Sequence, residues 1–139
     1  MEIILKIISL NTRPGYIIDI TEKVRSELLE TKLRDGMVCI FVAGSTAAIS
    51  TIEFEPGLVK TDVPEFLEKI IPYDGDYGHH QTWGDHNGAG HLRSFLIKTS
   101  QTFPFKNKRL LLGTWEQVIF CEFDEKGRNR NITITIIGE

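Results

Sequence analysis

Runs of strand-forming residues dominate this sequence and limit the fold that it can adopt. Residues 131–139, NITITIIGE, alternate isoleucine with polar residues at the two-residue period of a strand that buries one face. Residues 37–43, MVCIFVA, are apolar throughout, which is typical of a well-buried strand. Residues 47–55, AAISTIEFE, are expected to be its partner. Other strands are expected as a hairpin of residues 2–10 and 16–20, and at residues 91–97 and 109–123 with a break near Gly113.

Only two segments carry the longer period of an amphipathic helix. Residues 19–36 begin with a capping candidate, stop at a glycine and place four apolar side chains on one face: Ile20, Val24, Leu28 and Leu33. Residues 61–72 begin with Thr61 or Asp62 as a cap and carry prolines in the first turn and beyond the end. Because strands dominate and these helices do not alternate with them, we predict an α+β fold around antiparallel sheets.

The composition indicates one globular unit and excludes two classes of protein. With 139 residues, 41% of them hydrophobic, residues 1–139 are expected to form a single domain. A net charge of −3 gives no basic field for nucleic acid, and no apolar run reaches the ~20 residues of a membrane span. Cys39 and Cys121 stand among apolar neighbours, which suits reduced thiols. We therefore expect a cytoplasmic protein that binds neither nucleic acid nor membranes.

All four histidines lie in one glycine-rich segment, residues 78–92, GHHQTWGDHNGAGHL. Its glycines interrupt any helix, so the segment is predicted to be a loop whose backbone can approach a small ligand closely. His79, Asp85 and His91 follow one another at six-residue intervals, with Asn87 between the last two. Such imidazole, carboxylate and amide groups could bind a divalent ion or a phosphorylated ligand. A polar surface loop with solvated histidines is the alternative.

Two weaker candidates lie before and within the strand expected at residues 47–55. Ser45 and Thr46, after Gly44, offer small hydroxyls and free amides that could hold a phosphate, although such a composition also makes a common tight turn. Glu53 lies in an apolar strand context, where an unpaired carboxylate is costly. It is therefore expected to be exposed, salt-bridged or functional.

Arginine and tryptophan supply further candidates in the second half of the chain. In a strand, Arg93 would share a face with His91 and could neutralise an anionic ligand, or it could be solvated at an edge. Trp115 is expected by default to pack in the core. Arg128 and Arg130 lie on one face if their segment is extended, and a solvated hairpin turn explains them equally well.

The order of these motifs resembles the YjbQ family, whose members carry a secondary thiamine-phosphate synthase label. The similar motifs cover nearly the whole chain: DIT, STAA, IEFEPG, DYGH, GDHNGAGHLR, S-x-T-x-P from Ser100, LLLGTWEQV, and E-x-D with R-x-R. The resemblance implies sandwiched antiparallel β-sheets with two helices. It also implies a homotrimer with clefts at subunit boundaries and a phosphorylated small molecule as ligand.

The resemblance also implies roles for individual residues. The residues that it singles out as catalytic are His79, Asp85, His91 and Glu53. Those that it singles out for substrate binding are Ser45, Thr46, Asn87, Arg93 and Trp115. A divalent metal, Zn or Mg, would be held by His79 and His91. Gly44 departs from the frequent histidine of the family, and this favours phosphate binding over a three-histidine metal site. The alternative to a transferase is a non-catalytic trimeric binder of a phosphorylated metabolite or divalent metal.

Overall fold

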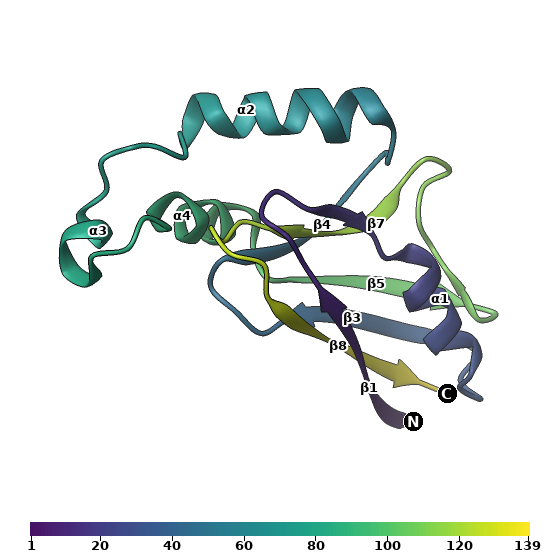
Figure 1. Cartoon of the computed structure of the whole chain (residues 1–139). Helices are drawn as coiled ribbons and strands as arrows, with labels where there is room; N and C mark the ends of the chain where they lie inside the picture. Colours follow the sequence, from purple (N-terminus) through teal and green to yellow (C-terminus); the bar gives the residue numbers. More distant parts are fainter.

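The chain folds into two antiparallel sheets and a layer of helices (Figure 1). The computed structural model describes residues 1–139. The larger sheet has the strand order β1-β8-β3-β5-β6 and the smaller sheet the order β2-β7-β4. The strands are β1 Glu2–Asn11, β2 Ile17–Asp19, β3 Gly36–Val42, β4 Ala47–Ile52, β5 Ser100–Lys106, β6 Arg109–Leu110, β7 Gln117–Glu122 and β8 Asn129–Gly138. The helices are α1 Thr21–Leu29, α2 Val63–Ile70, α3 Gly78–Trp83 and α4 Gly88–Ile97, with a π-helical turn at Leu58–Asp62 before α2. None of them has the length and apolar character needed to cross a membrane.

The main core lies between the two sheets and α1. The predicted apolar positions of the last strand and of the first helix all point into it: Ile132, Ile134, Ile136, Ile20, Val24, Leu28 and Leu33. These side chains alternate along β8 as a strand with one buried face requires. The sandwiched α+β architecture expected from the resemblance is confirmed, but with four α-helices instead of two.

The smaller sheet is buried on both faces. Val118 and Phe120 of β7 face the main core, whereas Ile119 and Cys121 face a second cluster that includes Leu67 of α2. Figure 1 shows α2 and α4 on this second side, where they form a third layer. Burial on both faces explains why β7 reads as a continuous apolar run.

The predicted strand pairings near the N-terminal half are wrong. Instead of forming a hairpin with β2, β1 pairs with β8, and β2 pairs with β7. Nor does β4 pair with β3, because the connection between them carries the chain into the smaller sheet, where β4 pairs with β7. An apolar pattern shows which faces are buried but does not name the partner strand. The first helix is also shorter than predicted, since the Thr31 hydroxyl caps the Leu28 carbonyl and Gly36 already belongs to β3.

Residues 78–97, predicted to be a loop followed by a strand, form the helices α3 and α4. Gly84 ends α3 in the left-handed region with φ 70°. Gly90 allows α4 to pack closely on the smaller sheet, because a Cβ there would lie 2.4 Å from the Phe123 carbonyl oxygen. One glycine thus ends α3, and another lets α4 pack closely on the sheet. Their low helix propensity does not reveal these roles.

The outer face of the larger sheet is apolar and open to solvent. Ile3, Leu5 and Ile7 of β1 are 66%, 64% and 65% exposed. Across β8, the β3 residues in the same rows include Met37 and Phe41, which are also exposed. This face therefore carries a row of large apolar side chains without a covering element in the chain.

Candidate functional site

The helices α3 and α4 and the turn between them bring four predicted side chains together. The His79 Nε2 atom lies 3.1 Å from Asn87 Oδ1 and 3.4 Å from Asp85 Oδ1. The rings of His79 and His91 meet edge to face, with centroids 4.5 Å apart. We call His79, Asp85, Asn87 and His91 the histidine cluster.

The buried amide of Asn87 determines which atoms face each other in this cluster. Its Nδ2 points to Asp124 Oδ1 at 3.5 Å, so its Oδ1 accepts a hydrogen bond from His79 Nε2. His79 therefore carries a proton on Nε2. The Asp85 Oδ1 atom is buried without a hydrogen-bond partner beside the same nitrogen. A buried carboxylate oxygen of this kind calls for a positively charged or protonated neighbour.

The donors of the cluster do not fit the metal that the resemblance implies. A metal ligand needs an unprotonated imidazole nitrogen, and His79 Nε2 is engaged with Asn87. No group of three histidine, cysteine or acidic side chains is arranged to hold an ion. As arranged, His79 Nε2 is committed to Asn87, and the side chains of the cluster do not converge as a set of three ligands.

Of the other two histidines, only His80 connects the helices. His80 Nε2 accepts a hydrogen bond of 3.0 Å from the Gly88 amide, at the start of α4. The His80 ring also packs edge to face on Tyr77 and His86. His86 itself is exposed. The hydrogen bond from the Gly88 amide to His80 joins α3 to the start of α4 and thereby helps to position His79.

A pocket of about 400 Å³ opens beside the cluster. The residues that line it are Gly44, Ser45, His91, Ser94, Phe95, Lys98 and Thr99. His91 thus belongs to both the pocket and the histidine cluster. The Gly44 and Ser45 amides donate no backbone hydrogen bond. Free amides on a turn form a concavity that suits an anion.

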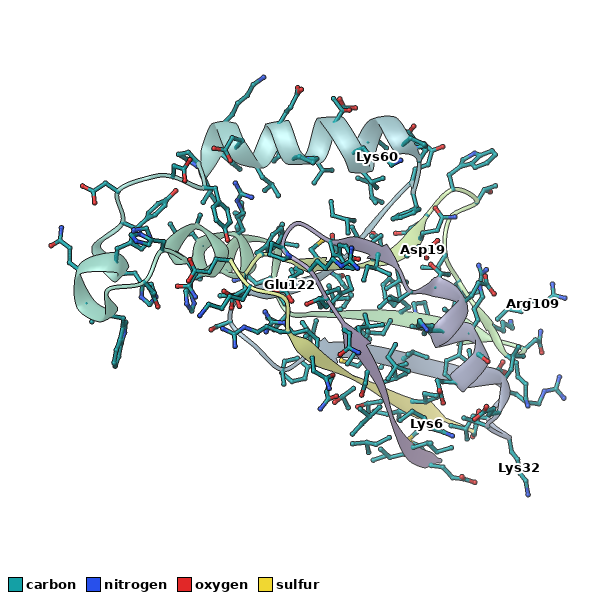
Figure 2. All side chains as sticks on the ribbon, in the orientation of Figure 1. Lys6, Asp19, Lys32, Lys60, Arg109 and Glu122 are labelled. Atoms are coloured by element: carbon teal, nitrogen blue, oxygen red, sulfur yellow. The ribbon has the colours of Figure 1, made fainter.

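An ion pair that is almost completely buried lies beneath this end of the sandwich. The Arg130 Nε and Nη2 atoms donate to the two oxygens of Glu122 at 2.8 and 2.6 Å, and Thr12 donates to the same carboxylate at 2.6 Å. Glu122 is 0% and Arg130 6% exposed. Figure 2 shows Glu122 toward the α3 and α4 side of the molecule, far from Arg109. Burial opposes ionisation of Glu122, but the hydrogen bonds from Arg130 and Thr12 outweigh it and lower the pKa of Glu122.

Asp124 links this ion pair to the histidine cluster. Its Oδ2 accepts hydrogen bonds from Thr46 Oγ1 at 3.0 Å and from Arg128 Nε at 2.7 Å, while its Oδ1 faces the Asn87 amide. The Thr46 hydroxyl in turn accepts a hydrogen bond from Arg130. Burial opposes ionisation of Asp124, but the hydrogen bonds from Arg128 and Thr46 prevail and lower its pKa. The Thr46 hydroxyl is thus committed to the chain's own groups.

Arg93 does not share a face with His91, as a strand would require. Both residues are in α4, where a two-residue step turns the side chain by about 200°. Arg93 donates to the Ile71 carbonyl at 2.7 Å and to Glu68 at 2.9 Å. It also stacks on Tyr73. Its side chain therefore ties α4 to the end of α2, away from the histidine cluster.

Glu53 and Trp115 lie at the other end of the smaller sheet. The pair Ile52↔Gln117 marks that end, and the pair Ala47↔Glu122 marks the end near the histidine cluster. At ~3.3 Å per residue, the strand between them spans roughly 17 Å. Both side chains are exposed, Trp115 by 71%, so the expected core position of the tryptophan is wrong.

A larger cavity lies elsewhere, between α2 and β2. Its volume is about 590 Å³, and its walls include Tyr16, Phe54 and Lys60. A smaller neighbour of about 310 Å³ reaches Tyr73 and Arg93. Neither has the histidines or the unpaired loop amides, so the pocket beside His91 is the stronger candidate despite its size.

The architecture and this pocket define a small α+β sandwich protein with a histidine-bearing site at one end. Residues 6–139 match the family model described as UPF0047 protein YjbQ-like. The chain belongs to the YjbQ/UPF0047 family.

Relatives and solved structures agree with this assignment. A UPF0047 protein of Methanothermobacter thermautotrophicus is 37% identical over 140 residues, covering 100% of this chain and 95% of that protein. The UPF0047 protein YugU of Bacillus subtilis is 33% identical, covering 91% and 93%. A crystal structure of a YbjQ-like protein of unknown function from Sulfolobus solfataricus has 29% identity, a TM-score of 0.92 and 99% coverage of both chains. A hypothetical protein from Aeropyrum pernix has 30% identity, a TM-score of 0.90 and 100% coverage of both chains.

Proposed function

We propose that this protein is a transferase of the thiamine-phosphate synthase type that acts on a phosphorylated small molecule in the pocket beside His91. The observation that supports this most directly is that His91 lines the pocket together with Gly44 and Ser45 and also contacts the ring of His79. A ligand in the pocket would meet loop amides on one side and an imidazole on the other. Both free cysteines support a reducing, cytoplasmic location.

The proposed reaction transfers a pyrimidinylmethyl group from a diphosphate to the ring nitrogen of a thiazole phosphate. The nitrogen of a thiazole phosphate attacks the methylene carbon of a pyrimidine methyl diphosphate, a C–N bond forms, the C–O bond breaks and pyrophosphate leaves with the electron pair. The barrier falls when fixed donors meet the charge that develops on the leaving oxygens. The Gly44 and Ser45 amides and the His91 imidazole are among the donors that this pocket offers.

The experiment that tests this function compares two histidine substitutions in purified protein. His91→Ala removes the imidazole shared by pocket and cluster, and we expect turnover to fall about a hundredfold or more. His86→Ala is the matched control, because His86 is exposed and does not line the pocket. Thiamine phosphate formation from the two phosphorylated precursors is measured. Equal turnover of both variants and the native chain would exclude the proposed site.

We propose further that the active assembly is a homotrimer with the site at a subunit boundary. Glu53 and Trp115 are exposed and distant from His91 within one chain, so they could serve the site only from a neighbouring copy. The apolar outer face of the larger sheet gives a second copy a surface to cover. Light scattering after size exclusion should give three times the chain mass of 15.8 kDa. A mass of one chain would contradict this assembly.

A divalent metal, Zn or Mg, is a less favoured part of the proposal. It would require His79 to release Asn87 and lose the Nε2 proton, with Asp85 supplying the negative charge. Metal analysis of the purified trimer measures this directly. One ion for each chain that is lost in His79→Ala would support the metal.

The second candidate function is a non-catalytic trimeric binder of a phosphorylated metabolite. It is favoured by the hydroxyl groups around the pocket, because Ser94 Oγ donates to the Ala47 carbonyl and Thr46 Oγ1 donates to Asp124. Ser94 has no base beside it, and the Asp124 carboxylate that accepts from Thr46 has a lowered pKa and is therefore too weak a base to activate the hydroxyl. Native mass spectrometry distinguishes the two functions. A retained phosphometabolite without turnover supports the binder.

A further inference from the structure

Lys98, which no sequence motif singled out, lines the pocket in a backbone conformation that glycine normally occupies. Its φ is 82° and its ψ 161°. Non-glycine residues persist in such regions only where the surroundings impose them, and they gather at ligand sites. The side chain is exposed, so it does not stabilise a core. Its Nζ lies over the Phe95 ring, 4.7 Å from the centroid, which holds the ammonium beside the pocket wall.

Arg130 lies directly behind Gly44, one of the residues that line the same pocket. Its Nε and Nη2 are used by Glu122 and Thr46, but its Nη1 makes none of the side-chain hydrogen bonds of the chain. The side chain is only 7% exposed. A Cβ on Gly44 would lie 2.6 Å from Nη1, so this nitrogen abuts the residue that lines the pocket. A nearly buried guanidinium thus leaves one nitrogen without a hydrogen-bond partner directly behind Gly44.

The surrounding charges leave an excess of positive charge at this place. Glu122 pairs with Arg130, and Asp124 pairs with Arg128. Lys98 forms no ion pair, and no acidic residue lines the pocket. The unpaired amides of Gly44 and Ser45 add partial positive charge. An anion that enters therefore meets donors without meeting a carboxylate.

We propose that Lys98 and the Arg130 Nη1 atom form a two-cation clamp for the phosphate monoester end of the ligand. The clamp rests on the proposed function for the identity of the rest of that ligand. A doubly charged phosphate end gains from both cations, whereas a carboxylate carries one charge to share between them. The clamp thus selects small molecules that end in a phosphate monoester over carboxylates of similar size.

Titration of the purified full-length protein with inorganic phosphate tests the clamp, with heat of binding as the readout. Lys98→Gln removes the charge and keeps the strained backbone. Gly44→Ala places a methyl group against Arg130 Nη1, since a Cβ there would lie 2.6 Å from that atom. We expect each substitution to weaken phosphate binding about tenfold, the typical value of one charge-assisted hydrogen bond. Lys60→Gln, beside the larger cavity under α2, is the control and should bind as the native chain does.

The outcomes separate the clamp from the function on which it rests. If both variants bind phosphate as the native chain does, or if acetate binds as tightly as phosphate, the clamp is wrong. Loss of turnover in His91→Ala would then still support the proposed function. If the native chain binds no phosphate, the clamp is also wrong. Unchanged turnover in His91→Ala would remove the proposed function as well.

Discussion

The two ends of the smaller sheet differ in how their polar groups are held. At the end near α4, Glu122 and Arg130 are buried, and each makes several short hydrogen bonds. At the opposite end, Glu53 and Trp115 are exposed. The first end is organised within one chain, whereas the second presents side chains to whatever lies outside it. The predicted site residues are therefore divided between an end that is packed within one chain and an end that is open to solvent in the single chain.

The largest expected effect on stability comes from breaking the buried ion pair at the end near α4. Glu122→Ala leaves the Arg130 guanidinium buried without its carboxylate, and loss of one partner of such a pair costs about 3–5 kcal/mol of unfolding free energy. Urea unfolding followed by circular dichroism measures this. Glu53→Ala at the exposed end is the matched control and should change the unfolding free energy by less than about 0.5 kcal/mol. Equal effects of the two substitutions would mean that the ends do not differ in this way.

Acid should weaken the same end by a smaller amount. The pKa values of Glu122 and Asp124 lie below their ordinary 4.5 and 3.8, so both carboxylates stabilise the folded state above those values. The free energy of unfolding should therefore fall as the pH drops below about 4.5 and continue to fall through the folded-state pKa values. Urea midpoints from pH 7 to pH 3 measure this. The fall should be shallower in Glu122→Gln, and an unchanged slope would contradict the assignment to this carboxylate.

The exposed end is tested next by Trp115→Ala. Because the tryptophan is 71% exposed in the single chain, its removal should hardly change the stability of the subunit. If a neighbouring copy covers it, truncation of a buried aromatic side chain should weaken association by about tenfold or more. Light scattering at decreasing protein concentration measures this. An unchanged dissociation constant would place the subunit boundary elsewhere.

The sequence predicts those parts of the fold in which one face of an element is buried. Alternation gave β8 correctly, and the four apolar positions of the first helix all enter the core. The helix predicted at residues 61–72 is confirmed as α2, Val63–Ile70. The predicted side-chain cap is wrong, because the first turn of α2 continues from a π-helical turn. Partner strands were not predictable in the same way. The choice of β7 over β3 as the partner of β4 depends on the whole sandwich, not on the local pattern.

The histidine cluster was predictable from its residues, but the groups that support it and the rest of the pocket were not. Clustering of histidines indicated where His79 and His91 would lie, although the glycines concealed the helices that carry them. Glu122 and Asp124 alternate at the end of a buried strand, and Arg128 and Arg130 alternate with the same period at the start of the next. Two acidic residues two apart are thus followed, across one turn, by two arginines two apart. This matching spacing was the available signal for the ion-pair network. Lys98 gave no signal, since only the backbone conformation distinguishes it.

The smallest expected effect sharpens the comparison at the pocket itself. Lys98→Gly relieves a conformation that strains any other residue, and we expect it to raise the unfolding free energy by ~1 kcal/mol after the added freedom of the unfolded chain is counted. The same substitution should weaken phosphate binding. Urea unfolding and phosphate titration of the same variant should therefore show a higher unfolding free energy together with weaker binding. A loss of both stability and binding would show that Lys98 is structural.

The reactivity of the Cys121 thiol reports on the separation of α2 from the smaller sheet. Burial between the smaller sheet and α2 raises the pKa of this thiol to about 12, so at neutral pH a thiol reagent attacks it only after the layers part. Cys39, half-buried on β3, reacts on a separate time course. The slower of the two modification rates therefore measures how often α2 separates from the smaller sheet.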